Sequence, residues 1–331
     1  MAKKYKVVVL DSENDMSLFE STIAKLLNND VEVVKIPAND TEALIRDAAD
    51  CDGILNPLTT IKEDTLSKLT KCKVIVKMGI GYDNIDADAA AKLGIQVANI
   101  PDYCQGEVAD QAMALFLTLN RRVYLADRQI RQGVWNDRVL SPDTPRLAGR
   151  KFGILGCGYI ARACAVRARA FGMEIIGYDP FVDAKTLADL DIKKIENVDD
   201  FLAEADFISL HIPALKENIG FVNLERLKKM KRSCLLINTA RGAIINEADL
   251  YTALKEKIIA GAGLDVRVSE PPKQPDPLAE LDNIVMTPHI GYYSVEADQS
   301  LRVKGAEEIA AAFLEGKPKH WVNQKGVAAR G

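Results

Sequence analysis

The chain has 331 residues, 48% of them hydrophobic and 27% charged, which is enough for two domains that each bury a core. Its 43 basic and 47 acidic side chains leave a net charge of −4, so the charge balance indicates neither a nucleic-acid partner nor a membrane partner. The sequence contains no apolar run of membrane-spanning length and no signal-peptide core near its start. We therefore expect a cytoplasmic protein.

Cysteine and histidine limit the chemistry that the chain can carry. The six cysteines are scattered without a C-x-x-C pair and lie mostly in apolar segments, which favours reduced, packed thiols and indicates no metal site. Any histidine chemistry depends on three residues: His211, His289 and His320.

The first hundred residues alternate apolar strands with helices, a pattern that predicts a parallel sheet covered on both faces. No glycine fingerprint follows the opening strand, so this region is a poor nucleotide binder and a candidate for the domain that accompanies a nucleotide-binding one. The expected strands are 5–10, 31–36, 53–55 and 73–78, and the expected helices are 17–28, 41–49 and 63–69.

Residues 79–86 (GIGYDNID) form a loop just past the end of a predicted strand, where open α/β sheets bind their ligands. Glycines on both sides of Ile80 leave the N–H groups of Ile80 and Gly81 able to face an anion such as a carboxylate. The alternative is an ordinary strand-to-helix turn in which Asp86 caps the next helix.

After residue 101 the pattern changes to one long, largely apolar helix, from about 105 to 132, which we interpret as the link between domains. It is too continuous to lie on a surface. Residues 133–145, which include Trp135, are irregular and are candidates for an arm that packs against a second subunit. A further helix is expected at 294–314, ended by Gly316 and Pro318.

Residues 151–161 (KFGILGCGYIA) read as a strand, a tight glycine turn and the start of a helix, with Gly156, Gly158 and Ala161 in the G-x-G-x-x-G/A positions. A second strand ends at Asp179, 23 positions past Gly156, where an acid suits the ribose hydroxyls of NAD and disfavours NADP. The pattern predicts a dinucleotide site. The alternative is a glycine turn of an ordinary βαβ unit.

Four later strands end in polar residues that parallel pairing would bring to one edge of the sheet: His211, Asn238 to Arg241, Asp265 with Glu270, and His289. An Arg, a Glu and a His beside a dinucleotide suit hydride transfer to a 2-oxo acid. Arg would bind the carboxylate, His would protonate the oxygen, and Glu would favour the charged imidazole. Taken singly, Arg241 has the alternative of a solvated turn residue, Glu270 that of an exposed loop acid and His289 that of a hydrogen-bonded turn histidine.

These segments together resemble the D-isomer-specific 2-hydroxyacid dehydrogenase family over nearly the whole chain. The resemblance rests on residues 79–86, the glycine turn at 153–158, NTARG at 238–242, LDV at 264–266 with EPP at 270–272, and TPHIG at 287–291. Two further segments are most similar to the branch of the family that includes the C-terminal binding proteins and phosphoglycerate dehydrogenase: NIPDYC at 99–104 and HIGYYS at 289–294.

The resemblance implies an α/β fold of two doubly wound parallel-sheet domains. A Rossmann coenzyme domain (102–298) is inserted in a discontinuous, flavodoxin-like substrate domain (1–101 and 299–331). It implies NAD as cofactor, a homodimer formed through the coenzyme domain, and no direct nucleic-acid or membrane partner. The implied reaction is NAD-dependent, reversible reduction of a 2-oxo acid to the D-2-hydroxy acid.

The same resemblance assigns site residues. Arg241, Glu270 and His289 are catalytic, and the expected substrate contacts are Ile80, Gly81, Tyr103, Tyr292 and Tyr293. The expected cofactor contacts are Val108, Gly156, Gly158, Tyr159, Ile160, Asp179, His211, Pro213, Asn218, Thr239, Ala240, Arg241, Asp265, His289 and Gly291.

The chain departs from the family pattern at three positions that concern the pyrophosphate: Tyr159 replaces a common Arg, Ala161 a Gly and Asn218 a Thr. Two other functions stay open. One is an NAD-sensing, corepressor-like binding protein with residual dehydrogenase activity, and the other is a sister oxidation of formate or phosphite. Glu270 argues against formate, because formate dehydrogenases of this family usually lack that residue. The sequence does not identify the 2-oxo acid.

Overall fold

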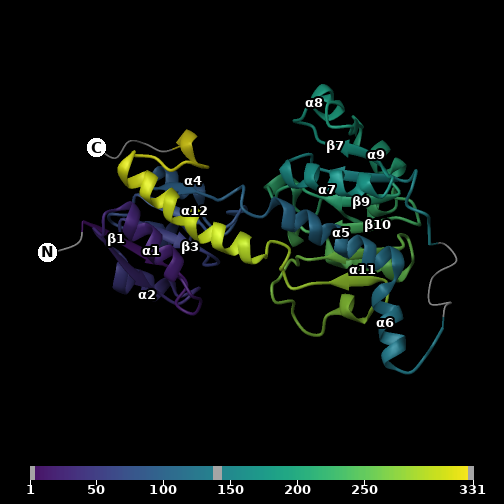
Figure 1. Cartoon of the computed structure of the whole chain (residues 1–331), viewed down its shortest axis with the longest axis horizontal. Helices are drawn as coiled ribbons and strands as arrows, with labels where there is room; N and C mark the ends of the chain where they lie inside the picture. The colour runs from purple at the N-terminus through teal and green to yellow at the C-terminus, as the bar shows by residue number, and fades with distance from the viewer. Residues whose placement is uncertain (1–3, 137–143, 327–331) are drawn as a thin grey trace. The chain divides into compact units, whose positions relative to one another are not determined.

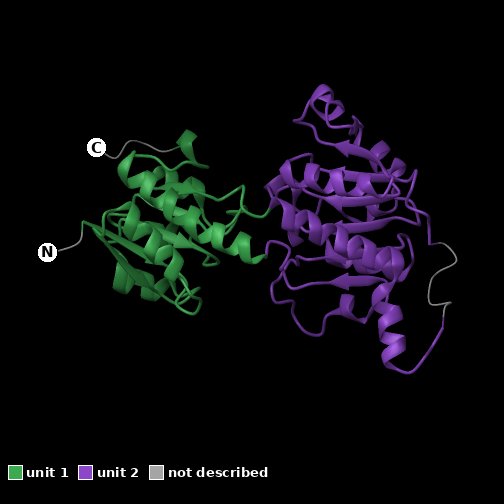
Figure 2. Cartoon of the chain, viewed as in Figure 1, with its two compact units in different colours: residues 1–104, 294–331 green, residues 105–293 purple. Residues whose placement is uncertain are grey.

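The computed structural model describes residues 4–136 and 144–326 and divides the chain into two compact units (Figures 1 and 2). Unit 1 comprises residues 1–104 and 294–331, and unit 2 comprises residues 105–293. The boundaries expected from the sequence, 101/102 and 298/299, lie three and five residues from these. The second of them would cut helix α12 (Val295–Leu314), which is continuous from its cap residue Ser294.

Unit 1 contains a five-stranded parallel sheet in the order β2-β1-β3-β4-β5, which is the flavodoxin-like order expected for the substrate domain. The strands are β1 (Tyr5–Val9), β2 (Val31–Lys35), β3 (Gly53–Asn56), β4 (Val74–Lys77) and β5 (Gln96–Ala98). The helices are α1 (Ser17–Leu26), α2 (Thr41–Ala48), α3 (Glu63–Leu66), α4 (Ala87–Lys92) and α12, with the short turn η5 (Gln324–Gly326).

Strand β1 shows why both faces of this sheet are covered. Val7 and Val9 point into a cluster with α1 and α12, whereas Val8 and Leu10 point into a second cluster with α2, α3 and α4. Helices α1 and α12 pack against each other (Figure 1). All four side chains are completely buried. A strand segment buried on both faces is apolar at successive positions, as the run Val7 to Leu10 is, whereas Lys6 near the start of the strand is only partly buried.

The C-terminal segment closes the β5 edge of the same sheet. Trp321 forms an antiparallel bridge with Ala98, and the N–H of Val322 donates to the carbonyl of Val97 at 2.9 Å. The side chain of Asn323 accepts from the N–H of Val97 at 2.8 Å and donates to the carbonyl of Ile95 at 3.0 Å. The edge strand therefore presents a paired backbone rather than a free one.

Unit 2 contains a seven-stranded parallel sheet in the order β12-β11-β10-β9-β6-β7-β8. Counted from β6, this is the 3-2-1-4-5-6 order of a dinucleotide-binding fold with one strand added, so the expected Rossmann architecture is confirmed. The strands are β6 (Lys151–Leu155), β7 (Glu174–Tyr178), β8 (Lys193–Lys194), β9 (Phe207–Leu210), β10 (Leu235–Asn238), β11 (Gly261–Leu264) and β12 (Ile284–Met286).

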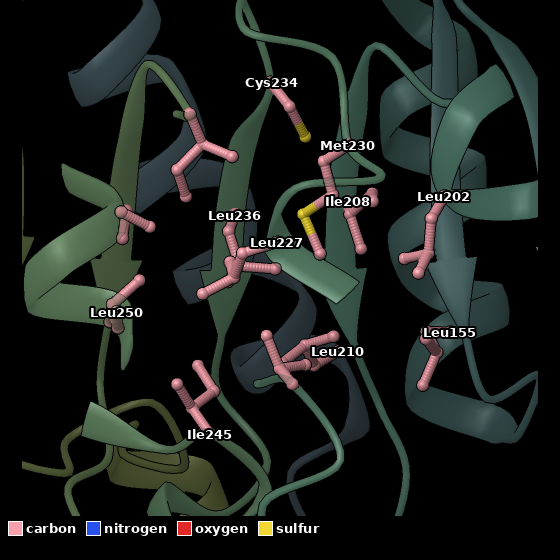
Figure 3. Packing of buried hydrophobic residues seen from close by; sticks show 14 of the residues in the cluster. Leu155, Leu202, Ile208, Leu210, Leu227, Met230, Cys234, Leu236, Ile245 and Leu250 are labelled. Atoms are coloured by element: carbon pink, nitrogen blue, oxygen red, sulfur yellow. The ribbon is translucent and has the colours of Figure 1, made fainter. Parts of the chain in front are cut away.

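Helices cover both faces of this second sheet. One face packs on α5 and α7 around Phe116, Phe152 and Phe207, whose rings meet edge to face. On the other face, Leu155, Leu210 and Leu236 pack with residues of the helices that follow β8 (Figure 3). The helices and turns are α5 (Gln105–Arg121), α6 (Val123–Arg131), α7 (Tyr159–Ala170), α8 (Ala184–Ala188), α9 (Val198–Glu204), η2 (Lys216–Asn218), α10 (Leu224–Leu227), η3 (Gly242–Ile244), α11 (Glu247–Lys255) and η4 (Pro277–Glu280).

The prediction of one buried helix over 105–132 is wrong. The helix breaks at Arg122, whose φ of +50° is left-handed, and the following helix α6 has no buried side chain. Apolar residues continue across the break, so hydrophobic periodicity did not reveal it. Of the expected arm at 133–145, residues 137–143 lie outside the described residues, and Trp135 is 91% exposed.

All six cysteines are buried thiols that form no disulfide bond, as the sequence predicted. Over residues 4–136 and 144–326, no helix combines the length and apolarity that a membrane crossing requires. Within the same ranges, no three His, Cys, Asp or Glu side chains gather in a way that could hold a metal ion.

Candidate active site

The polar residues that follow the strands of unit 2 lie at the carboxyl-terminal ends of its parallel strands, which we call the site edge of the sheet. Strands β6, β9, β10, β11 and β12 are all parallel, so the residues that follow each of them emerge on the same side. These residues are Gly156, His211, Thr239, Asp265 and Thr287. The edge therefore combines a glycine turn with the acids and bases expected of a catalytic group.

The two glycines of the turn have different physical roles. Gly156 has a φ of +88°, and a Cβ there would lie 2.9 Å from the backbone carbon and oxygen of His211. Gly158 precedes helix α7, and a Cβ there would meet no atom within 4 Å. The first glycine is required by backbone conformation and packing, whereas the second leaves space for a ligand at the helix N-terminus.

Asp179 lies beside this turn. One carboxylate oxygen accepts from the N–H of Cys157 and the other from the N–H of Phe181, both at 2.9 Å. Tyr159, which replaces the common arginine of the family, is 71% exposed on the first turn of α7. Arg162 lies 5.9 Å from the Tyr159 ring and donates from Nε to the carbonyl of Cys157.

Two buried polar atoms at this edge have no hydrogen-bond partner among the described residues: Nε2 of His211 and Oγ1 of Thr239. Burial lowers the pKa of His211 to about 4, so its imidazole is neutral at ordinary pH. Buried polar atoms are rarely left unpaired unless a water or a ligand pairs with them. Together with the open space at Gly158, they fit a polar dinucleotide at this edge.

The turn that carries Arg241 is held by Asn238, which the sequence analysis named at a strand end but did not assign to the site. Asn238, completely buried at the end of β10, donates from Nδ2 to the carbonyl of Arg241 at 2.9 Å. Its Oδ1 accepts from the N–H of Ala240 at 3.0 Å. The signal was present in the sequence, since an Asn that follows a buried strand often hydrogen-bonds the backbone of a turn.

Asp265 holds the loop that carries His289. Its backbone carbonyl accepts from the N–H of His289 at 2.8 Å, and its buried carboxylate accepts from the N–H groups of Ile290 and Gly291 at 3.0 and 2.8 Å. His289 has a φ of +55°, a conformation that an ordinary residue keeps only when its surroundings impose it. Asp265, which the sequence analysis expects to contact the cofactor, fixes the backbone of the histidine.

The side chains of His289 and Glu270 meet at this edge. Nδ1 of His289 lies 2.7 Å from one carboxylate oxygen of Glu270, and the other oxygen accepts from the N–H of Arg267 at 2.9 Å. Burial alone would raise the pKa of the Glu270 carboxyl. The two hydrogen bonds, with the charges of His289 and Arg241, outweigh burial and bring that pKa below its ordinary value.

The remaining cofactor candidates of unit 2 occupy several elements. Val108 is buried in α5, Ile160 is half-buried in α7, and Asn218 donates to the carbonyl of Pro213 at 2.9 Å. Gly291 is buried against the Asp265 carboxylate. Within unit 2, Glu270 and His289 are in contact, and the loops that carry Arg241 and the glycine turn follow parallel strands at the same end of the sheet.

The loop at 79–86 belongs to unit 1. Gly79 has a φ of +149°, and the carbonyl of Ile80 accepts from Nδ2 of Asn99 at 2.7 Å. The N–H groups of Ile80 and Gly81 donate to no acceptor among the described residues, so both are available to an anion. Asp86 caps α4 by accepting from the N–H of Ala89 at 2.9 Å, as the alternative interpretation of this loop predicted.

The three tyrosines expected at the substrate lie in two units. Tyr103 packs against the core of unit 1, with its hydroxyl close to Gly79. Tyr292 and Tyr293 follow the His289 loop in unit 2, with rings 6.3 Å apart. His320 lies elsewhere in unit 1, where its Nδ1 is 2.7 Å from the buried carboxylate of Glu308.

Known proteins resemble this chain in sequence and in fold. Residues 113–291 match the family model described as "D-isomer specific 2-hydroxyacid dehydrogenase, NAD binding domain". A glyoxylate reductase of Korarchaeum cryptofilum is 38% identical over 296 residues, which cover 87% of this chain and 88% of that protein.

Two further proteins show the range of relatives. A D-3-phosphoglycerate dehydrogenase of Methanocaldococcus jannaschii is 35% identical over 97% of this chain, which spans only 60% of that longer protein. The crystal structure of a D-lactate dehydrogenase from Aquifex aeolicus, complexed with NAD and lactic acid, is similar with a TM-score of 0.83 and 28% identity. The match covers 94% of this chain and 96% of that one.

The fold and the site define an NAD-binding oxidoreductase of the two-unit α/β type. The chain belongs to the D-isomer specific 2-hydroxyacid dehydrogenase family. NAD is accordingly its cofactor class, and its relatives act on small hydroxy or oxo acids.

Proposed function

We propose that the chain reduces a 2-oxo acid to the D-2-hydroxy acid with NADH, in a reversible reaction. The observation that carries this proposal is the pair formed by Nδ1 of His289 and the Glu270 carboxylate, 2.7 Å apart at the edge that holds the glycine turn. An imidazole beside a carboxylate can donate a proton in one direction and accept it in the other.

In the proposed reaction, bound NADH supplies the hydride and the protein supplies the proton. Nε2 of His289 donates to the carbonyl oxygen, because Nδ1 is engaged by Glu270. The guanidinium of Arg241 binds the substrate carboxylate and polarises the carbonyl. In the reverse direction, neutral His289 accepts the hydroxyl proton.

The cofactor is held by residues of unit 2. The N–H groups at the start of α7 and the exposed face of Gly158 would receive the pyrophosphate. Asp179 would accept from the ribose hydroxyls, and Nε2 of His211 and Oγ1 of Thr239 would find polar partners on the dinucleotide.

A panel of 2-oxo acids tests the proposal directly. NADH oxidation is followed with glyoxylate, hydroxypyruvate, pyruvate and longer 2-oxo acids, and chiral chromatography identifies the product. The proposal expects steady turnover with at least one of them and, where the product is chiral, the D-isomer. NADH binding without turnover on any 2-oxo acid contradicts it.

We propose further that the protein is a homodimer formed through unit 2. The support is helix α6, in which no side chain is buried and Val123 and Ile130 are each more than half exposed. An apolar helix face left in water favours association. Sedimentation velocity should show a dimer that Ile130→Asp weakens, whereas a monomer at all concentrations contradicts this proposal.

A further inference from the structure

The loop between β11 and η4, which presents Glu270, contains an arginine turned away from solvent. The side chain of Arg267 is 9% exposed and binds two carboxylates at once. Its Nε and Nη2 donate to Glu247 at 2.9 and 3.1 Å, and its Nη1 and Nη2 donate to Asp276 at 2.7 and 3.0 Å. A guanidinium in this fork geometry fixes the positions of both partners.

The two carboxylates lie on elements that flank the Glu270 loop. Glu247 is the first residue of α11, and Asp276 caps η4 by accepting from the N–H of Leu278. The hydrogen bonds from Arg267 lower the pKa of Asp276, so this carboxyl stays ionised. The loop is therefore clamped at its base between a helix and a turn.

The backbone at Arg267 contacts the catalytic candidates directly. Its N–H donates to Oε1 of Glu270 at 2.9 Å, and the next N–H, that of Val268, donates to Glu247 at 2.9 Å. A Cβ on Gly242 would lie 1.9 Å from the carbonyl carbon of Arg267, so the turn that follows Arg241 packs tightly on this backbone. One residue thus borders both Glu270 and the Arg241 turn.

We propose that Arg267 is a positioning residue of the reaction, which orients the Glu270 carboxylate toward His289 through its ion pairs with Glu247 and Asp276. This inference rests on the proposed function, because it assigns Glu270 as the partner of the catalytic imidazole. The clamp holds the Arg267 backbone in place. That backbone holds one oxygen of Glu270, which leaves the other oxygen aimed at Nδ1 of His289.

The charged groups that surround Glu270 determine what loss of the Arg267 clamp should do to His289. Glu270 faces His289 and lies in the field of Arg241, and the clamp adds the charges of Arg267, Glu247 and Asp276. Asp265 acts on the His289 loop through backbone hydrogen bonds. If the clamp is lost, the Glu270 carboxylate is freer to turn to solvent, and the imidazolium of His289 loses part of its stabilisation.

Nuclear magnetic resonance of the protein without substrate tests this inference. The chain has three histidines, so ¹⁵N-labelled histidine gives three imidazole titrations, assigned with His289→Ala, His211→Ala and His320→Ala. The variants are Arg267→Met, which removes the guanidinium, and Arg267→Lys, which keeps the charge but cannot bind both carboxylates in the fork geometry. Glu270→Gln supplies the full effect of losing the carboxylate charge.

Two more variants complete the design. Glu247→Gln removes one of the two carboxylates that bind Arg267, at a side chain that is 26% exposed. It leaves less unpaired charge buried than Arg267→Met does, so it replaces Arg267→Met if that variant does not fold. Lys231→Met is the matched control. It breaks a 2.9 Å ion pair with the largely buried Asp206. Asp206 precedes β9, at the amino-terminal end of the parallel strands and so away from the site.

The expected result is a fall in the His289 titration midpoint in Arg267→Met of at least half the fall in Glu270→Gln, a smaller fall in Arg267→Lys, and none in Lys231→Met. We expect kcat/KM for the 2-oxo acid to fall roughly tenfold to hundredfold in Arg267→Met, with NADH affinity unchanged.

A midpoint that moves in Glu270→Gln but not in folded Arg267→Met or Glu247→Gln overturns the inference and leaves the proposed function standing. Failure of every 2-oxo acid to turn over overturns the proposed function instead. The titration, which needs no substrate, still decides the position of Glu270.

Discussion

Nδ1 of His289 and Oε2 of Glu270 lie 2.7 Å apart, although the two residues come from different loops of the chain. The other Glu270 oxygen is held by a backbone N–H, and the pKa of this carboxyl lies below its ordinary value because these contacts outweigh the effect of burial. Glu270 is therefore anionic throughout the range in which an imidazole titrates.

The first prediction concerns the pH dependence of Glu270→Gln. Reduction needs protonated His289, so the rate of reduction is high at low pH and falls as the imidazole loses its proton with rising pH. An anionic Glu270 delays that fall to higher pH, and the neutral amide of the variant removes the delay. We expect kcat/KM for reduction to fall at lower pH in the variant, as measured by initial rates between pH 5 and 10.

The lowered pKa of the Glu270 carboxyl also determines how folding stability depends on pH. Ionised Glu270 stabilises the folded state fully above the ordinary pKa of Glu, and this contribution is lost as pH falls through the lower folded value. An identical pH profile for reduction in the wild type and in Glu270→Gln contradicts the role given to this residue.

The second prediction compares two histidines that each have a glutamate partner. His289→Ala should reduce turnover by roughly 10²–10⁴-fold, the range expected for loss of a general acid, with little change in NADH binding. His320→Ala removes an imidazole at the same 2.7 Å distance from Glu308 and should leave turnover unchanged. Steady-state rates and NADH fluorescence titrations measure both, and near-normal turnover in His289→Ala would exclude it as the acid.

The third prediction is a preference for NADH over NADPH. The carboxylate of Asp179 lies beside the glycine turn, where it would repel a 2′-phosphate. Asp179→Ser should shift the ratio of kcat/KM values toward NADPH by roughly tenfold, which corresponds to about 1.4 kcal/mol. Asp189→Ser, at an exposed carboxylate paired with Lys185, is the control. Equal kcat/KM for both cofactors in the wild type would refute the prediction.

The fourth prediction concerns stability in unit 1. Asn323 is buried and its side chain makes four hydrogen bonds, accepting from Val97 and Trp321 and donating to Ala87 and Ile95. Asn323→Ala leaves backbone groups unpaired and should cost about 2–4 kcal/mol. Native-state hydrogen exchange at the amide of Val97 measures this cost. The neighbouring exposed Gln324→Ala should have no effect, and unchanged exchange at Val97 in Asn323→Ala would contradict the prediction.

The sequence determined the two-unit fold and the members of the candidate site because these depend on local patterns. Apolar strands buried on both faces, the glycine turn at Gly156 and polar residues at successive strand ends are each readable within a few positions. Parallel pairing then places the strand ends at one edge without further information. Arg241, Glu270 and His289 could for that reason be selected as a group before their geometry was known.

Only the tertiary structure decided the features that depend on contacts between distant residues. Apolar residues recur on both sides of the break at Arg122, and the left-handed backbone of His289 depends on Asp265, 24 positions earlier. The clamp at Arg267 joins Glu247 and Asp276, which are 20 positions before and 9 positions after it. A charged residue in a loop is usually solvated, so nothing local distinguishes one that is buried. Burial and ion pairing arise from packing, which a one-dimensional pattern does not contain.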